Sequence, residues 1–92
     1  MIPVQRFIPE ALAAVLQRAP LTPEKVAFAW RTAVGASVDR ATSVALDGYT
    51  LRVTARDEQW RREIEHSASL IRARLDALLG PGIVRGLNVI IQ

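Results

Sequence analysis

Residues 46–64 decide the fold, and they read L-D-G-Y-T-L-R-V-T-A-R-D-E-Q-W-R-R-E-I. Apolar and polar side chains alternate over residues 49–56, which is typical of a strand with one buried face. Asp47-Gly48 predicts a tight hairpin turn, because Asp-Gly is a preferred pair where both central positions need positive φ. Asp57 stands where a helix N-cap is expected, and Trp60 opens an apolar stripe at helical spacing. The stretch therefore predicts a turn, a half-buried strand and the start of a helix.

Two helices are expected before this stretch. The first begins near Pro9 and ends near Arg18. Thr22-Pro23-Glu24 predicts the start of the second, with a capping hydroxyl, a proline at the first position and an acid in the first turn. The apolar stripe of this helix continues past Gly35, which either ends the helix or permits close packing inside it. We expect the helix to continue to about Ala41.

Two further strands and the rest of the long helix complete the predicted order. A short strand at residues 43–46 precedes the turn, and the helix capped by Asp57 runs to Leu79, where G-P-G stops it. A last strand follows at residues 83–91. The order α-α-β-β-α-β predicts a single α+β domain over residues 1–92, with a three-stranded mixed sheet, helices on one face and a right-handed crossover.

The composition limits what the chain can do. Cysteine is absent, which excludes a disulfide framework and a cysteine-based zinc site and is consistent with a reducing cytoplasm. No signal peptide or membrane-spanning run is visible, so we expect a cytoplasmic protein with no membrane partner. Aromatic residues are few, and Trp30 and Trp60 are the expected core anchors.

No catalytic set can be assembled from these residues. His66 is the single histidine and is expected on the solvent side of the long helix. The serines have no evident base, and the acids at the start of the long helix complement its dipole. We therefore expect no enzyme activity, no small-molecule substrate, no metal and no cofactor.

The positive charge is carried mainly by arginine, whose planar fork suits phosphate. The formal net charge is +3, and eleven of the twelve basic residues are arginines. Arg52 and Arg56 are four apart on the predicted strand, so both should point to the open face of the sheet. The candidate nucleic-acid contacts are Lys25, Arg31, Arg40, Arg52, Arg56 and Arg85. The alternative is an ordinary solvated sheet face whose arginines discourage aggregation.

The chain resembles the DciA family of bacterial replicative-helicase loaders, many of whose members are described only as domains of unknown function. The resemblance rests on W-R-T-A-V-G at residues 30–35, on the stretch at 46–64, on L-L-G at 78–80 and on the apolar last strand. The matching positions are Trp30, Val34, Gly35, Asp47, Gly48, Leu51, Val53, Trp60 and Ile64. Four of these (Trp30, Gly35, Gly48 and Trp60) are expected to serve the structure. The resemblance implies a KH-like fold, DNA binding and contact with the replicative helicase.

Two departures from related proteins leave alternatives open. Many DciA relatives carry a further C-terminal region implicated in helicase contact, whereas this sequence ends at Gln92 and reads as a short form. The GxxG loop with which KH domains clamp nucleotides is absent. We expect a DNA-binding accessory of bacterial replication. The alternatives are a protein-interaction module that uses the open sheet face or a strand edge, and an RNA-binding KH-like protein.

Overall fold

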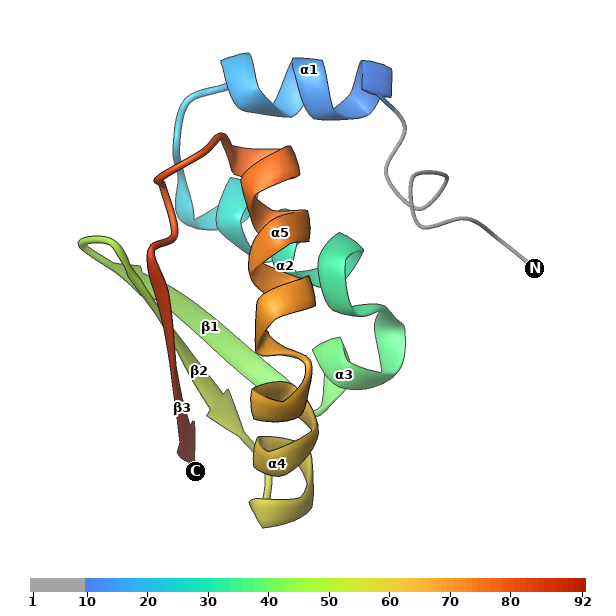
Figure 1. The fold of residues 1–92 in the computed structure, drawn as a ribbon, viewed down its shortest axis with the longest axis vertical. Coiled ribbons are helices and arrows are strands. Elements are labelled where there is room, and N and C mark those ends of the chain that lie inside the picture. The colour runs from blue at the N-terminus through green and yellow to red at the C-terminus, as the bar shows by residue number, and fades with distance from the viewer. Residues whose placement is uncertain (1–9) are drawn as a thin grey trace.

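The computed structural model describes residues 10–92, so the predictions for residues 1–9 lie outside the described part. Its elements follow the predicted order, with each of the two longer helices divided in two (Figure 1). In chain order they are α1 (Glu10–Arg18), α2 (Pro23–Val34), α3 (Ala36–Arg40), β1 (Thr42–Asp47), β2 (Thr50–Ala55), α4 (Glu58–His66), α5 (Ala68–Leu79) and β3 (Gly86–Ile91).

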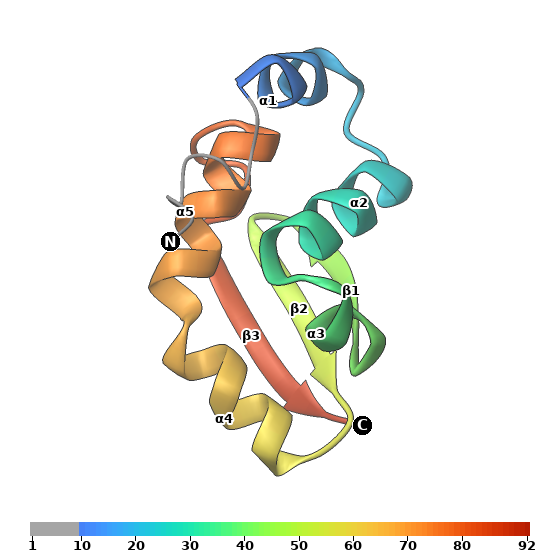
Figure 2. The same ribbon diagram turned by 90° about the vertical axis from the view of Figure 1, so that its right-hand side faces the viewer.

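The three strands form one mixed sheet in the order β1-β2-β3. β1 and β2 are antiparallel neighbours joined by the hairpin, whereas β2 and β3 are parallel and joined through α4 and α5. Figures 1 and 2 show all the helices on the same side of the sheet. The predicted mixed sheet with helices on one face is therefore confirmed.

Alternation along β2 builds the core as predicted. Leu51, Val53 and Ala55 are fully buried on the helix-covered face. Trp30 of α2 packs against them and is only 1% exposed, whereas Trp60 is half-buried at the margin of the same cluster. Both tryptophans thus contact the core, but Trp30 is its central anchor.

The hairpin turn lies one residue later than predicted. β1 includes Asp47 and β2 begins at Thr50, so Gly48 and Tyr49 form the two-residue loop. Gly48 has a φ of 62°, and no non-glycine residue in the described chain has a positive φ. One positive φ, on a glycine at the first loop position, matches a type II′ turn, which fits the twist of a hairpin. The assumption that both loop positions have positive φ was wrong.

Gly35 ends α2, so the predicted continuation of this helix to about Ala41 is wrong. The residue has a φ of 89° and a ψ of 168°, which a side chain with a Cβ rarely adopts. Its backbone N–H still closes α2 by donating to the carbonyl of Arg31 at 2.8 Å. The chain then turns into the short α3, which leads directly into β1.

Substituting Gly35 with alanine should lower the free energy of unfolding by about 1–3 kcal/mol, because alanine is strained at this φ and ψ. Gly86→Ala is the matched control, since Gly86 has no positive φ and a Cβ there would meet nothing within 4 Å. Urea unfolding of both variants measures the difference. Equal effects of the two substitutions would contradict a conformational role for Gly35.

The predicted long helix is divided at Ser67, where φ is −100° and ψ is 11°. Serine is a modest helix former whose hydroxyl competes for backbone groups, so this is a favourable point for a bend. The break lets the two helices pack against different elements. α4 packs against β3 and β2, whereas α5 packs mainly against α1 and α2. Ile64 before the break and Ile71 after it are both buried.

Both predicted N-caps are confirmed. The backbone N–H of Lys25 donates to Thr22 Oγ1 at 3.1 Å at the start of α2. The backbone N–H of Trp60 donates to Asp57 Oδ1 at 3.1 Å at the start of α4. The second cap fixes the point at which the chain leaves β2 and begins its crossover toward β3.

Candidate nucleic-acid interface

The face of the sheet away from the helices carries mainly polar and small side chains, together with the exposed Ile90 of β3. Because Leu51, Val53 and Ala55 point into the core, the residues between them on β2 point outward. Arg52 lies at the centre of this open face, paired with Ala45 of β1 on one side and Asn88 of β3 on the other. All three are exposed. The exposed guanidinium of Arg52 is therefore accessible to a large ligand.

A shallow hollow lies at the end of the sheet where β2 leaves it. Its volume is about 320 Å³, and it is lined by Arg40, Ala41, Thr42, Ser43, Thr54, Arg56 and Gln92. We call it the basic hollow. The backbone N–H of Arg56 donates to the carbonyl of Ala41 at 3.0 Å, which holds the end of β2 beside the end of α3.

The chemistry of the basic hollow suits a phosphate. Two guanidinium groups, the hydroxyls of Ser43 and Thr54 and the amide of Gln92 supply hydrogen-bond donors. No aspartate or glutamate is among its lining residues. Arginine binds phosphate oxygens in a bidentate fashion, and hydroxyls and amides add neutral donors. The hollow can therefore receive a phosphate group with several donors at once.

The six predicted contact residues are distributed over the molecule. Arg40 and Arg56 share the basic hollow, and Arg52 lies on the same sheet face four residues before Arg56. Arg31 is exposed, but it lies on α2, which covers the opposite face of the sheet. The structure therefore brings Arg40 and Arg56 together, places Arg52 farther along the same sheet face, and does not bring Arg31 to them.

Lys25 is not part of this surface, in contrast to the prediction. Its side chain is 8% exposed, and Nζ donates to the carbonyl of Ala19 at 2.8 Å. The ammonium group closes the loop between α1 and α2. A lysine held in this way has a structural role.

Arg85 lies at the hairpin end of the sheet, away from the basic hollow. Its guanidinium carbon is 4.0 Å from the centre of the Tyr49 ring, a cation–π contact, and Nε donates to the carbonyl of Gly82 at 3.3 Å. Tyr49 is 56% exposed, so its predicted place in the buried row of β2 is wrong. The reason is that Tyr49 belongs to the turn and not to the strand.

Sequence reasoning missed the three residues that add neutral hydrogen-bond donors to the basic hollow. Thr54 was visible only as part of the polar row of β2, and Ser43 as part of a short strand. Gln92 gave no signal, because its place depends on the parallel pairing in which its N–H donates to the carbonyl of Ala55 at 2.9 Å. These residues meet only once the sheet has formed.

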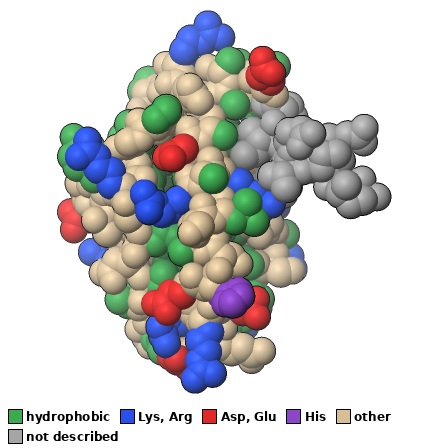
Figure 3. Space-filling model, in the orientation of Figure 1, with side chains coloured by type: hydrophobic (Ala, Val, Ile, Leu, Met, Phe, Trp, Pro, Cys, Tyr) green, Lys and Arg blue, Asp and Glu red, His purple; other side chains and the backbone are tan. Residues whose placement is uncertain are grey.

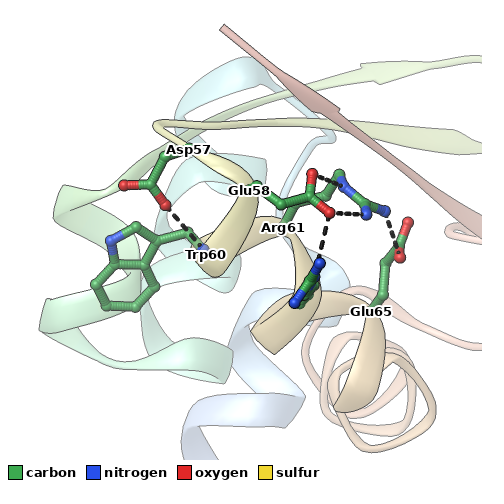
Figure 4. Close-up of polar contacts among 6 residues, drawn as sticks. Asp57, Glu58, Trp60, Arg61 and Glu65 are labelled. Atoms are coloured by element: carbon green, nitrogen blue, oxygen red, sulfur yellow. Dashed lines mark hydrogen bonds and ion pairs between the residues drawn. The ribbon is translucent and has the colours of Figure 1, made fainter.

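The arginines of α4 are engaged by carboxylates, as Figure 4 shows. Arg61 pairs with Glu58 and, at 2.6 Å, with Glu65, while Arg62 Nε lies 3.2 Å from Glu58 Oε2. On the face drawn in Figure 3, acidic and basic side chains are likewise intermixed beside the purple His66. The paired charges of this cluster leave no excess positive charge for a phosphate.

The Glu58 carboxyl should titrate at a pH of about 2. Hydrogen bonds from Arg61, and then from Arg62, lower its pKa from 4.5 to about 2. Because the pKa is lower in the folded state, the stabilisation is present above pH 4.5 and is lost as the pH falls from 4.5 toward 2. Side-chain NMR titration of the protein and of an Arg61→Ala variant measures this. An ordinary pKa in the unsubstituted protein would contradict the ion-pair geometry.

Three further features of residues 10–92 were considered as sites. His66 is exposed at the end of α4, as predicted. Within this range no three histidine, cysteine, aspartate or glutamate side chains are grouped so that they could hold a metal ion. None of the helices described has the length and apolar character needed to cross a membrane.

Comparison with known proteins shows a partial similarity. The chain is similar to a UPF0232 protein of Mycolicibacterium smegmatis. The two are 34% identical over 62 residues, which cover 66% of this chain. The same match covers 32% of the Mycolicibacterium protein, which is about a third of its length. No protein-family model matches the chain.

Proposed function

We propose that this protein binds nucleic acid, and DNA in the first place, as a non-catalytic accessory of bacterial replication. The basic hollow is the observation that carries the proposal. It joins two arginines, two hydroxyls and an amide at the end of an open sheet face, with no acidic lining residue. Phosphate contacts of this kind supply most of the affinity in sequence-independent binding.

The spacing of the three arginines fits a phosphate backbone. Arg52 and Arg56 are separated by four residues of extended chain, which spans about 13 Å. Along duplex DNA this length corresponds to about four base steps on one strand. Arg52 and the basic hollow would therefore contact different phosphates of the same backbone.

The sequence resemblance to the DciA family supports a role beside the replicative helicase. The residues that carry it lie mainly in the core and the turns, as Trp30, Gly48 and Leu51 illustrate. They support the fold, and the proposed contact with the helicase rests on the sequence resemblance.

Fluorescence anisotropy with labelled 20-nucleotide single strands and 20-base-pair duplexes tests nucleic-acid binding. With three arginine–phosphate contacts, the slope of log K against log salt should be about −2.7 for duplex DNA and about −2.1 for single strands. Duplex affinity should thus fall about 40-fold between 50 and 200 mM salt. The absence of binding at 50 mM, or binding that does not depend on salt, would refute the proposal. RNA of the same length distinguishes the RNA-binding alternative.

A further inference from the structure

The outer edge of β1 carries backbone groups that have no strand partner among residues 10–92, because β1 pairs only with β2. The N–H of Arg56 donates to the carbonyl of Ala41, so the hydrogen-bonded pairs of this ladder fall on the odd-numbered residues. Thr42, Val44 and Leu46 therefore point their N–H and C=O groups away from β2. The edge also lacks the usual protection, because T-S-V-A-L-D contains no lysine, no proline and no interruption of its register.

An apolar groove lies beside the same edge. Its volume is about 290 Å³, and it is lined by Leu21, Thr22, Pro23, Val26, Val44, Ala45 and Leu46. Leu21 is 50% exposed there. Val44 and Leu46 alternate with exposed residues along β1, and their side chains lie on the helix-covered side. An added strand with the same alternation would set its own apolar residues against this groove.

The two ends of the edge carry opposite charges. Where β1 begins, the basic hollow supplies the exposed guanidinium groups of Arg40 and Arg56. At the hairpin end, the exposed carboxylates are those of Asp47, the last residue of β1, and Glu24, which directly follows the lining residue Pro23. A strand that fits this edge must therefore be acidic at one end and basic at the other.

The neighbouring charged groups leave this difference in place. Beside the arginines, Asp39 is only partly exposed and the Asp57 carboxylate caps α4. Beside the carboxylates, Lys25 donates its Nζ hydrogen bond to a backbone carbonyl of the preceding loop. Arg85 is stacked on Tyr49 and directly precedes β3, so β2 separates it from the outer edge of β1.

We propose that the edge of β1 binds a second copy of this chain, so that two β1 strands pair antiparallel and join two sheets into one. A two-fold interface uses the same surface of both copies. Antiparallel pairing then brings the basic end of each edge to the acidic end of the other. A peptide of one charge sign would match one end and be repelled at the other, whereas a second copy matches both ends.

The outward backbone groups also define the register. A two-fold axis at Val44 pairs this residue with its own copy and Thr42 with Leu46, which uses all the outward groups of the strand in about six hydrogen bonds. In this register Asp47 lies on the same sheet face as Arg56 of the second copy and two strands away from it. The gap is about 10 Å between backbones, which an arginine and an aspartate side chain bridge together.

Sedimentation equilibrium of the full chain, without nucleic acid, tests this inference. Between about 10 µM and about 1 mM, the average mass should rise from 10.1 kDa toward twice that value. Asp47→Arg should weaken the association more than about tenfold, because it opposes like charges at both ends of the interface. Glu63→Arg is the matched control, since Glu63 is exposed on α4, which packs against β3 and β2. The control should change the association less than about twofold. A chain that stays monomeric would overturn the proposal.

A charge exchange tests the antiparallel orientation. The double variant Arg40→Glu, Arg56→Glu should also lose self-association, because its glutamates meet Asp47 of the second copy. Mixing it with Asp47→Arg should restore association as a one-to-one complex, since opposite charges then meet at both ends. This recovery also shows that both variants are folded. Failure of the mixture to associate, or undiminished self-association of Asp47→Arg, would overturn the proposal.

Amide hydrogen exchange locates the contact. Raising the protein concentration should protect the amides of Val44 and Leu46 and leave those of Ser43 and Ala45, which already bond to β2, unchanged. Association without protection of Val44 and Leu46 would place the interface elsewhere and overturn the proposal. Because these measurements contain no nucleic acid, their outcome is independent of whether the same arginines bind DNA.

Discussion

Replacement of Trp30 by alanine should lower the free energy of unfolding by about 3–5 kcal/mol. Trp30 is among the largest fully buried side chains and is 1% exposed. Its Nε1–H also donates to Thr42 Oγ1 at 3.0 Å, and this hydroxyl in turn donates to the carbonyl of Val38 at 2.7 Å. The substitution therefore opens a cavity and removes a link between α2 and β1. For a domain of this size the total stability is about 5–14 kcal/mol, so the variant should be unfolded in part at 37 °C.

Two further variants serve as comparisons for Trp30→Ala. Trp60→Ala should cost roughly half as much, because Trp60 is only half-buried at the margin of the core. Trp30→Phe should cost about 1 kcal/mol for the lost hydrogen bond, together with a smaller packing loss. Urea or thermal unfolding followed by circular dichroism measures all three. A loss below 1 kcal/mol for Trp30→Ala would show that the tryptophan is not the anchor of the core.

The double substitution Arg40→Ala, Arg56→Ala should weaken duplex DNA binding about 60-fold at 0.1 M salt. The estimate follows from counterion release, in which two lost phosphate contacts reduce the salt slope by about 1.8. The slope should fall from about −2.7 to about −0.9, leaving the contribution of Arg52. Both residues are exposed, so the fold should be unchanged. Anisotropy titrations at several salt concentrations measure slope and affinity together.

The matched control removes the same charge elsewhere. Arg18 and Arg72 are exposed on α1 and α5, far from the open sheet face, and Arg18→Ala, Arg72→Ala lowers the net charge equally. This variant should change the affinity only slightly, through the overall charge. If both double variants lose affinity equally, the protein attracts DNA by its net charge and the basic hollow has no special role.

The fold could be predicted where the signal is local. Alternation over residues 49–56 identified the central strand, and Thr22 and Asp57 marked helix starts that their side chains do cap. The break at Gly35 was not predicted, because an apolar stripe continues across it and only the backbone angles show the turn. The bend at Ser67 was hidden in the same way, since Ile64 and Ile71 keep helical spacing across it.

The candidate site was less accessible to sequence reasoning. The outward direction of Arg52 follows from strand alternation alone. Arg40 lies beside Arg56 because α3 ends next to the end of β2. The prediction did not contain α3, so it could not place these two arginines together. Lys25 was misjudged because a carbonyl from the preceding loop captures its ammonium group, and composition carries no information on that contact.

The parallel pairing of β2 with β3 has a consequence for biosynthesis. The central strand obtains its second neighbour only after the whole of α4 and α5 has been made, because β3 follows them in the sequence. While the nascent chain emerges from the ribosome, Leu51 and Val53 of the β1–β2 hairpin stay partly exposed until β3 has been synthesised. Apolar side chains exposed in this way favour association with other chains. We therefore expect ribosome-bound intermediates that stop before Gly86 to be sensitive to protease and to recruit chaperones.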